Sequence, residues 1–131
     1  MKRLTKEDIR KSSGILNPVG HVVLAFKDDA ATQAVEALRG SGFGAEDILV
    51  YTASEATPRL RERVQTASQG AGFGYEITLM RRYLAYAEEG AGWLIVYAPD
   101  DAAAARIVEV GTRLHALCAV RYHRLVSEDL L

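Results

Sequence analysis

The residues best suited to binding a ligand surround a run of glycines at alternate positions, Gly70, Gly72 and Gly74. A glycine-rich loop at the start of a helix presents backbone N–H groups to an anion, and guanidinium groups strengthen such binding. The loop runs from helix to helix and lacks a Gly-Lys-Ser/Thr ending, unlike the phosphate loops of nucleotide-binding proteins. A helix hairpin is therefore the structural alternative. The candidate residues for a small anionic ligand are Gly72, Gly74, Tyr75, Arg81 and Arg82.

No other constellation points to catalysis. The three histidines, His21, His115 and His123, have no second ligand at a metal-binding spacing, so neither a metal nor another cofactor is expected. No serine lies in a nucleophile elbow. Cys118, the single cysteine, lies between apolar residues and is expected to be a buried hydrophobe. We therefore expect a protein that is not an enzyme, although strand pairing could bring His21 and His123 together as a pH-sensitive pair.

Two aspartate doublets have a structural explanation, because each follows an apolar run in a repeated pattern. Residues 22–31 read Val-Val-Leu-Ala-Phe-Lys-Asp-Asp-Ala-Ala, and residues 94–103 read Leu-Ile-Val-Tyr-Ala-Pro-Asp-Asp-Ala-Ala. Short runs rich in β-branched residues predict buried strands, and aspartates after them cap the helices that follow. The doublets are therefore interpreted as helix caps.

These patterns predict an α+β fold. Strands are expected over residues 19–26, 47–53, 93–98 and 119–126, with a helix after the first and third. A helix starting at Thr57-Pro58 and another over Tyr75 to Glu89 form a pair inserted between the two βαβ units. The expected arrangement is a ferredoxin-like βαβ-βαβ sandwich, with a three-layer parallel α/β sandwich as the competing layout. The second strand is expected to be buried on both faces, and the last strand, with its cations, to lie at a sheet edge.

The helix over Tyr75 to Glu89 has apolar residues on two sides. One row contains Ile77, Met80, Leu84 and Ala87, and the second contains Leu79, Tyr83 and Tyr86. A helix that is apolar on two sides needs two partners, and the second is either the preceding helix or another copy of the protein. The open face of the sheet needs a cover as well, which is either the inserted helices or the sheet of a partner. We therefore expect a homodimer or higher oligomer, with Leu79, Tyr83 and Tyr86 at the interface.

Composition bounds the remaining possibilities. The chain has 131 residues, 49% of them hydrophobic and 25% charged, with a formal net charge of −1, which is typical of one globular domain. Residues 1–18 are interpreted as a basic, solvated N-terminal arm and residues 19–131 as a single α+β domain. Nucleic-acid binding is not expected, since it would need the arm and Arg59, Arg61, Arg63 and Arg121 to share one surface. A single cysteine, no apolar segment long enough for a membrane and no secretory pattern predict cytoplasmic localisation.

Residues 22–50 resemble a known family. The resemblance is carried by Val23-Leu24-Ala25-Phe26, Ala34-Val35-Glu36-Ala37-Leu38, Gly42-Phe43 and Asp47-Ile48-Leu49-Val50. This stretch is similar to the N-terminal domain of bacterial general stress proteins of the heat-induced type. The resemblance covers about thirty residues, mostly core and turn positions. It implies the fold and a stress-related context, and it transfers no catalytic residue.

Taken together, these features predict a non-enzymatic binding or protein-interaction module that associates with itself. The alternative is a sensor or enzyme for a small anionic metabolite, with a cleft near the loop from Gly70 to Gly74.

Overall fold

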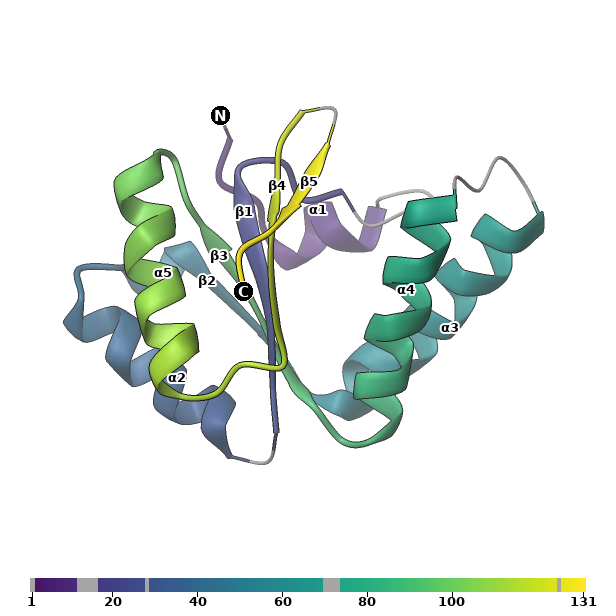
Figure 1. Cartoon of the computed structure of the whole chain (residues 1–131), viewed down its shortest axis with the longest axis horizontal. Coiled ribbons are helices and arrows are strands. Elements are labelled where there is room, and N and C mark those ends of the chain that lie inside the picture. The colour runs from purple at the N-terminus through teal and green to yellow at the C-terminus, as the bar shows by residue number, and fades with distance from the viewer. Residues whose placement is uncertain (1, 12–16, 28, 70–73, 125) are drawn as a thin grey trace.

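The computed structural model describes residues 2–11, 17–27, 29–69, 74–124 and 126–131, without the side chains of residues 11, 67–69 and 74–76. These residues form a mixed α/β fold around one five-stranded antiparallel sheet of order β2-β3-β1-β4-β5 (Figure 1). A 3₁₀ turn at Ala45–Asp47 precedes β2. The helices are α1 (Lys6–Lys11), α2 (Ala30–Gly40), α3 (Ala53–Gln69), α4 (Gly74–Glu88) and α5 (Asp101–Arg113); the strands are β1 (His21–Phe26), β2 (Ile48–Tyr51), β3 (Gly92–Tyr97), β4 (Cys118–Tyr122) and β5 (Ser127–Asp129).

The two copies of the repeated pattern become the central pair of strands. β1 and β3 pair antiparallel, with Leu24 opposite Leu94 and Val22 opposite Val96. β1 and β2 both pair antiparallel with β3, so these two strands run parallel on either side of it. By the same argument β3 and β4 run parallel on either side of β1. The two predicted βαβ units are therefore present, each with a strand of the other unit between its own two strands.

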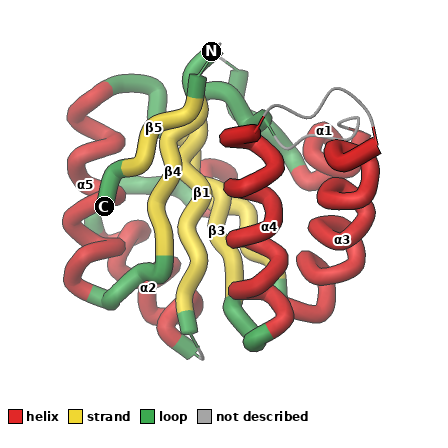
Figure 2. The backbone as a smooth tube through the Cα atoms, turned by 45° about the vertical axis from the view of Figure 1, so that its right-hand side comes forward, coloured by secondary structure: helices red, strands yellow, loops and turns green. Residues whose placement is uncertain are grey.

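Helices cover both faces of the sheet (Figure 2). Strand alternation sends Leu24 and Leu94 into a core with α2 and α5, and sends Val23 and Ile95 into a second core with α1, α3 and α4. The chain's own inserted helices therefore cover the face for which the sequence left a partner sheet as an option. No helix in the described part of the chain is long and apolar enough to cross a lipid bilayer.

Two strand predictions are wrong. β2 is an edge strand, and Val50 on it is 40% exposed, so this strand is not buried on both faces. β4 is an inner strand, because the segment expected to continue it turns back as β5 and pairs with it. The register places Arg121 of β4 opposite Glu128 of β5. Opposite charges thus face each other across a strand pair where an exposed edge was expected.

Helix α3 begins five residues before the predicted start. Thr52 and Glu55 form a capping box, since the Thr52 N–H donates to the Glu55 carboxylate at 2.9 Å and the Glu55 N–H donates to the Thr52 hydroxyl at 3.1 Å. Pro58 therefore lies inside the helix instead of at its first position. The strong cap at Thr52 overrides the start signal of Thr57-Pro58.

The aspartates that follow the repeated strands lie at helix starts, as predicted for the described ones. Asp100 caps α5, and its side chain accepts the Ala103 N–H at 2.8 Å. Asp29 occupies the equivalent position before α2, but its side chain makes no capping hydrogen bond. Asp28 lies outside the described residues.

The N-terminal residues are not a solvated arm in the part that the structure describes. Ile9 of α1 is 4% exposed and belongs to the core shared with α3 and α4, and Leu4 packs against the same core. The Arg3 guanidinium pairs with the Asp47 carboxylate at 2.7 Å. Periodicity could not reveal this helix because it has only six residues, five of which are charged.

Candidate functional site

The predicted ligand-binding residues do not form a described site. Gly70, Gly72 and the rest of residues 70–73 lie outside the described residues, and Gly74 and Tyr75 begin α4 without described side chains. Arg81 and Arg82 are exposed on α4. The Arg82 guanidinium forms an ion pair with the Asp129 carboxylate of β5 at 3.4 Å. The two arginines line neither of the pockets described below.

The predicted interface residues pack inside this chain. Tyr83 is fully buried and Leu79 is 3% exposed, both in the core between α4 and the sheet, while Tyr86 is half-buried beside that core. The expectation that Leu79 and Tyr83 contact a second copy is therefore corrected. The second apolar row of α4 is explained by its position between the sheet and α3.

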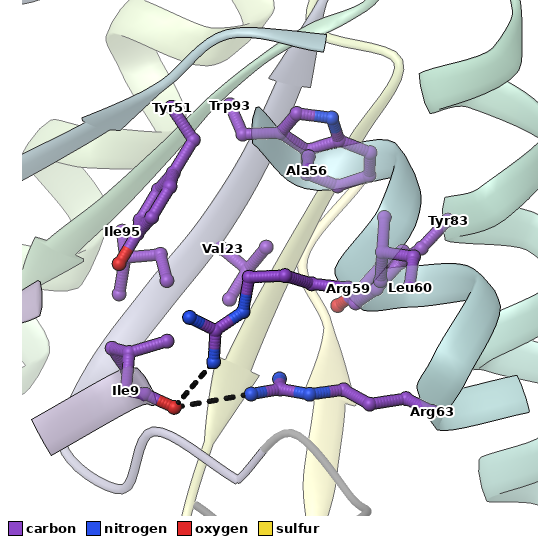
Figure 3. Close-up of a pocket in the computed structure, with 10 residues that line it drawn as sticks. All are labelled: Ile9, Val23, Tyr51, Ala56, Arg59, Leu60, Arg63, Tyr83, Trp93 and Ile95. Atoms are coloured by element: carbon purple, nitrogen blue, oxygen red, sulfur yellow. Dashed lines mark hydrogen bonds between the residues drawn. The ribbon is translucent and has the colours of Figure 1, made fainter. Parts of the chain in front are cut away.

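A pocket opens between the sheet, α1 and α3 (Figure 3). Its volume of about 50 Å³ exceeds the space that one water molecule needs, about 10 to 15 Å³. Most of its wall is apolar, which suits the body of a small organic molecule. The lining residues are Ile9, Val23, Tyr51, Ala56, Arg59, Leu60, Arg63, Tyr83, Trp93 and Ile95.

Two arginines of α3 provide the charge in this pocket. Helical spacing places Arg59 and Arg63 beside the core residues Ala56 and Leu60, on the face that α3 turns toward the sheet. Figure 3 shows both side chains reaching the backbone carbonyl of Ile9, with N···O distances of 2.8 Å from Arg59 and 3.1 Å from Arg63. Arg63 is only 6% exposed. Burial, and next the nearby charge of Arg59, lower the pKa of Arg63.

Two polar atoms of the pocket residues are buried without a hydrogen-bond partner among the described residues, the Tyr51 hydroxyl and the Trp93 Nε1. Burial raises the pKa of Tyr51 although the charges of Arg59 and Arg63 oppose the shift, so the hydroxyl stays protonated at neutral pH. Lys6 of α1 lies over the ring of this tyrosine, 4.6 Å from its centroid. Because buried donors are nearly always paired in folded proteins, an unpaired hydroxyl beside two guanidinium groups is available to an acceptor.

The wall of the pocket opposite α1 is built from aromatic contacts. The Tyr83 ring packs edge-on against Trp93, with centroids 5.1 Å apart, and its hydroxyl lies 2.9 Å from that of Tyr122. Cys118 belongs to the same core, and burial raises the pKa of its thiol to about 12. A thiol that stays protonated is a poor nucleophile. This arrangement is suited to binding, and it supplies no activated nucleophile among these side chains.

A second pocket, at the end of β4, contains two side chains, Arg121 and His123, that already have carboxylate partners. It is lined by Val19, Gly20, Ala98, Arg121, Tyr122, His123 and Arg124. The Arg121 guanidinium contacts Asp101 at 2.8 Å, and the His123 Nε2 contacts Glu128 at 3.1 Å. The ring nitrogens of His21 bind the backbone of Leu4 and Val19 instead, so the two histidines have separate partners.

From the sequence, Arg59, Arg61 and Arg63 were considered together for nucleic-acid binding, but the structure places Arg59 and Arg63 at the pocket. The spacing of Ala56, Leu60 and Arg63 at i, i+4 and i+7 was the signal available. Arg61 alone of the three faces solvent, where it pairs with Glu88.

Within the described residues, no three His, Cys, Asp or Glu side chains are grouped as metal ligands.

Comparison of the chain with protein-family models, with curated proteins and with solved structures found no match. The geometry of the pocket therefore carries the functional argument.

Proposed function

We propose that this protein is a non-enzymatic binding module whose ligand is a small organic anion with an apolar body, held in the pocket between α1, α3 and the sheet. One observation carries the proposal. The Arg59 and Arg63 guanidinium groups converge on a single neutral carbonyl oxygen, that of Ile9, in an otherwise apolar pocket.

Energetics favour an anion at this position. Removing a cation from water costs several kcal/mol, and two neighbouring cations also repel each other. The Ile9 carbonyl carries only a partial charge, and no carboxylate among the described residues forms an ion pair with Arg59. A carboxylate would accept charge-assisted hydrogen bonds from both guanidinium groups and one from the Tyr51 hydroxyl. Apolar side chains at positions 59 and 63 would fill the space more stably if packing were their only role.

This proposal combines the two functions expected from the sequence. It keeps a binding module without catalysis and takes the small anionic ligand from the alternative, but it places the ligand beside α3 instead of near Gly70 to Gly74. The reasons given for self-association, an uncovered sheet face and a free row on α4, are accounted for by packing within one chain. Self-association is therefore no part of the mechanism proposed here, and a stress-related role stays a prediction from the resemblance.

The frame of the site is proposed to be ferredoxin-like, with α3 and α4 inserted between its halves. The order β2-β3-β1-β4 and the position of α2 and α5 on one face support this description. The site would then belong to the inserted pair and α1, which are additions to that frame. A cytoplasmic location completes the proposal, as expected from the sequence.

Isothermal titration calorimetry tests the binding proposal. The panel pairs hexanoate with 1-hexanol and benzoate with benzyl alcohol, and includes inorganic phosphate. We expect saturable binding of the carboxylates only, because the alcohols lack the charge and phosphate lacks the apolar body. Arg59→Gln should abolish binding, whereas Arg39→Gln, at an exposed position on α2, should leave it unchanged. The proposal fails if no carboxylate binds, or if alcohols bind equally well.

A further inference from the structure

We propose that α1 is the built-in occupant of this pocket, and that a small aliphatic or aromatic monocarboxylate binds by displacing Ile9 from it. This inference rests on the proposed function and adds both the ligand class and the means of its regulation. Ile9 imitates such a ligand, because its carbonyl oxygen accepts from Arg59 and Arg63 while its side chain is buried among the apolar lining residues.

The carbonyl of Ile9 is a weak competitor for the guanidinium groups. It belongs to the last turn of α1, where carbonyl groups lack partners within the helix and must find them elsewhere. A full negative charge forms stronger hydrogen bonds with Arg59 and Arg63 than a carbonyl does. An incoming carboxylate therefore gains more from these two side chains than α1 gains.

The described contacts of α1 outside the core lie at the protein surface or at its margin. A helix of six residues is unstable by itself and depends on tertiary contacts. Besides Ile9 and Leu4 in the core, the contacts of the segment include the Leu4 N–H bond to His21, the Arg3–Asp47 and Lys6–Glu55 ion pairs, and the positions of Arg3 over Tyr97 and Lys6 over Tyr51. Partly exposed ion pairs of this kind contribute little. Outside the core, displacement of α1 therefore breaks contacts that are mostly partly exposed.

Displacement also makes room for the ligand. With α1 in place, the pocket of about 50 Å³ has room for the carboxylate group of a ligand and for only part of its apolar body. When Ile9 withdraws, the volume of a branched aliphatic side chain is added beside Val23 and Ile95. The enlarged space matches acids with a short alkyl chain or a single ring. The N-terminal segment therefore limits access to the pocket, and its release from the pocket accompanies ligand binding.

Hydrogen exchange of the full chain with and without saturating hexanoate tests this inference. We expect amides of residues 4–11 to lose protection while amides of residues 53–63 gain it. If hexanoate binds and α1 stays equally or better protected, the inference is wrong and the proposed function survives. If hexanoate does not bind in the calorimeter, the proposed function itself fails, and the inference fails with it.

A variant remote from the pocket gives a second test. Arg3→Ala removes the ion pair to Asp47 and leaves Arg59, Arg63 and Tyr51 in place. Weakening a competitor raises the apparent affinity, here by roughly two- to fivefold for a partly exposed ion pair. Arg113→Ala, at an exposed position on α5, is the matched control and should leave the affinity unchanged. Equal or weaker hexanoate binding by Arg3→Ala would contradict the role of α1 as a competitor.

Discussion

The Nε2 atom of His21 accepts the backbone N–H of Leu4 at 3.2 Å, which joins the N-terminal segment to β1. Since Nε2 is the acceptor, Nδ1 carries the proton and donates to the Val19 carbonyl at 2.9 Å. The ring is 1% exposed and lies 5.2 Å from that of Tyr97. Only a neutral imidazole makes both hydrogen bonds.

Stability should depend on the protonation of His21. Burial lowers its pKa, and the charge of Arg3 acts in the same direction, while the Val19 carbonyl and Asp47 oppose the shift. The unfolded chain, with an ordinary histidine pKa of about 6.5, then binds more protons than the folded chain. The contribution of His21 to the free energy of unfolding is therefore fully present above about pH 6.5. It decreases as the pH falls toward the folded pKa. Urea denaturation at several pH values between 5 and 8 measures this slope.

The control for this prediction is His21→Gln, which keeps an acceptor for Leu4 and should lose the slope in that window. Asp8 and Glu55 also have lowered pKa values, from hydrogen bonds to Thr5 and Thr52 respectively, but carboxylates affect stability at lower pH. The NMR titration of the His21 ring in the unmodified protein gives the pKa directly. A pKa at or above 6.5 would refute the prediction.

The two repeated helix starts should respond differently to substitution. Asp100→Ala removes a side-chain cap and should lower the free energy of unfolding by about 0.5–2 kcal/mol. Asp29→Ala removes no capping hydrogen bond and should cost less. Chemical denaturation of both variants compares them. Equal losses for the two variants would show that the hydrogen bond from Ala103 to Asp100 adds no stability, which contradicts the prediction.

The Tyr83–Tyr122 hydroxyl pair should be coupled energetically. Tyr83→Phe removes a buried hydrogen bond and should cost about 1 kcal/mol of stability. The double variant with Tyr122→Phe should lose less than the two single variants together, because each single variant already breaks the shared bond. A double-mutant cycle from urea denaturation yields the coupling energy, and a value near zero would contradict the contact.

Arg59 should be required for ligand binding and should not stabilise the fold. Arg59→Met keeps the apolar stem and removes the cation, so the free energy of unfolding without ligand should stay equal or rise by about 1 kcal/mol. Binding of hexanoate should disappear in the same variant. Leu60→Ala, at the neighbouring pocket position, should instead cost about 2–5 kcal/mol as an ordinary core truncation. If Arg59→Met lowers the free energy of unfolding by about 3 kcal/mol, Arg59 stabilises the core and the prediction is wrong.

Much of the fold was predictable because apolar spacing determines which faces are buried. The repeated runs became the central strands β1 and β3, and the two-sided pattern of α4 reflects real burial on two sides. The edge positions could not be predicted. They depend on whether the chain after Tyr122 continues or turns back as β5, and no strong turn signal such as Asn-Gly marks that reversal.

The candidate site was missed for two physical reasons. Arginine counts as polar in a periodicity analysis, yet its long stem allows Arg63 to occupy a core-facing position with its charged end in the pocket. The other half of the site comes from α1, which is too short for a periodic signal and approaches α3 only through tertiary packing. The contact between Ile9 and Arg59 joins residues that are 50 positions apart, so neither segment by itself predicts it.

The indole N–H of Trp93 offers the most direct test of the pocket as a ligand site. The chain has one tryptophan, so its indole N–H gives one resonance, and the side chain lines the pocket. Titration of ¹⁵N-labelled protein with hexanoate should shift this resonance in a saturable manner, while 1-hexanol should not, and Arg59→Gln should abolish the shift. A resonance that hexanoate leaves in place, or that the alcohol moves to the same extent, would contradict the proposed function.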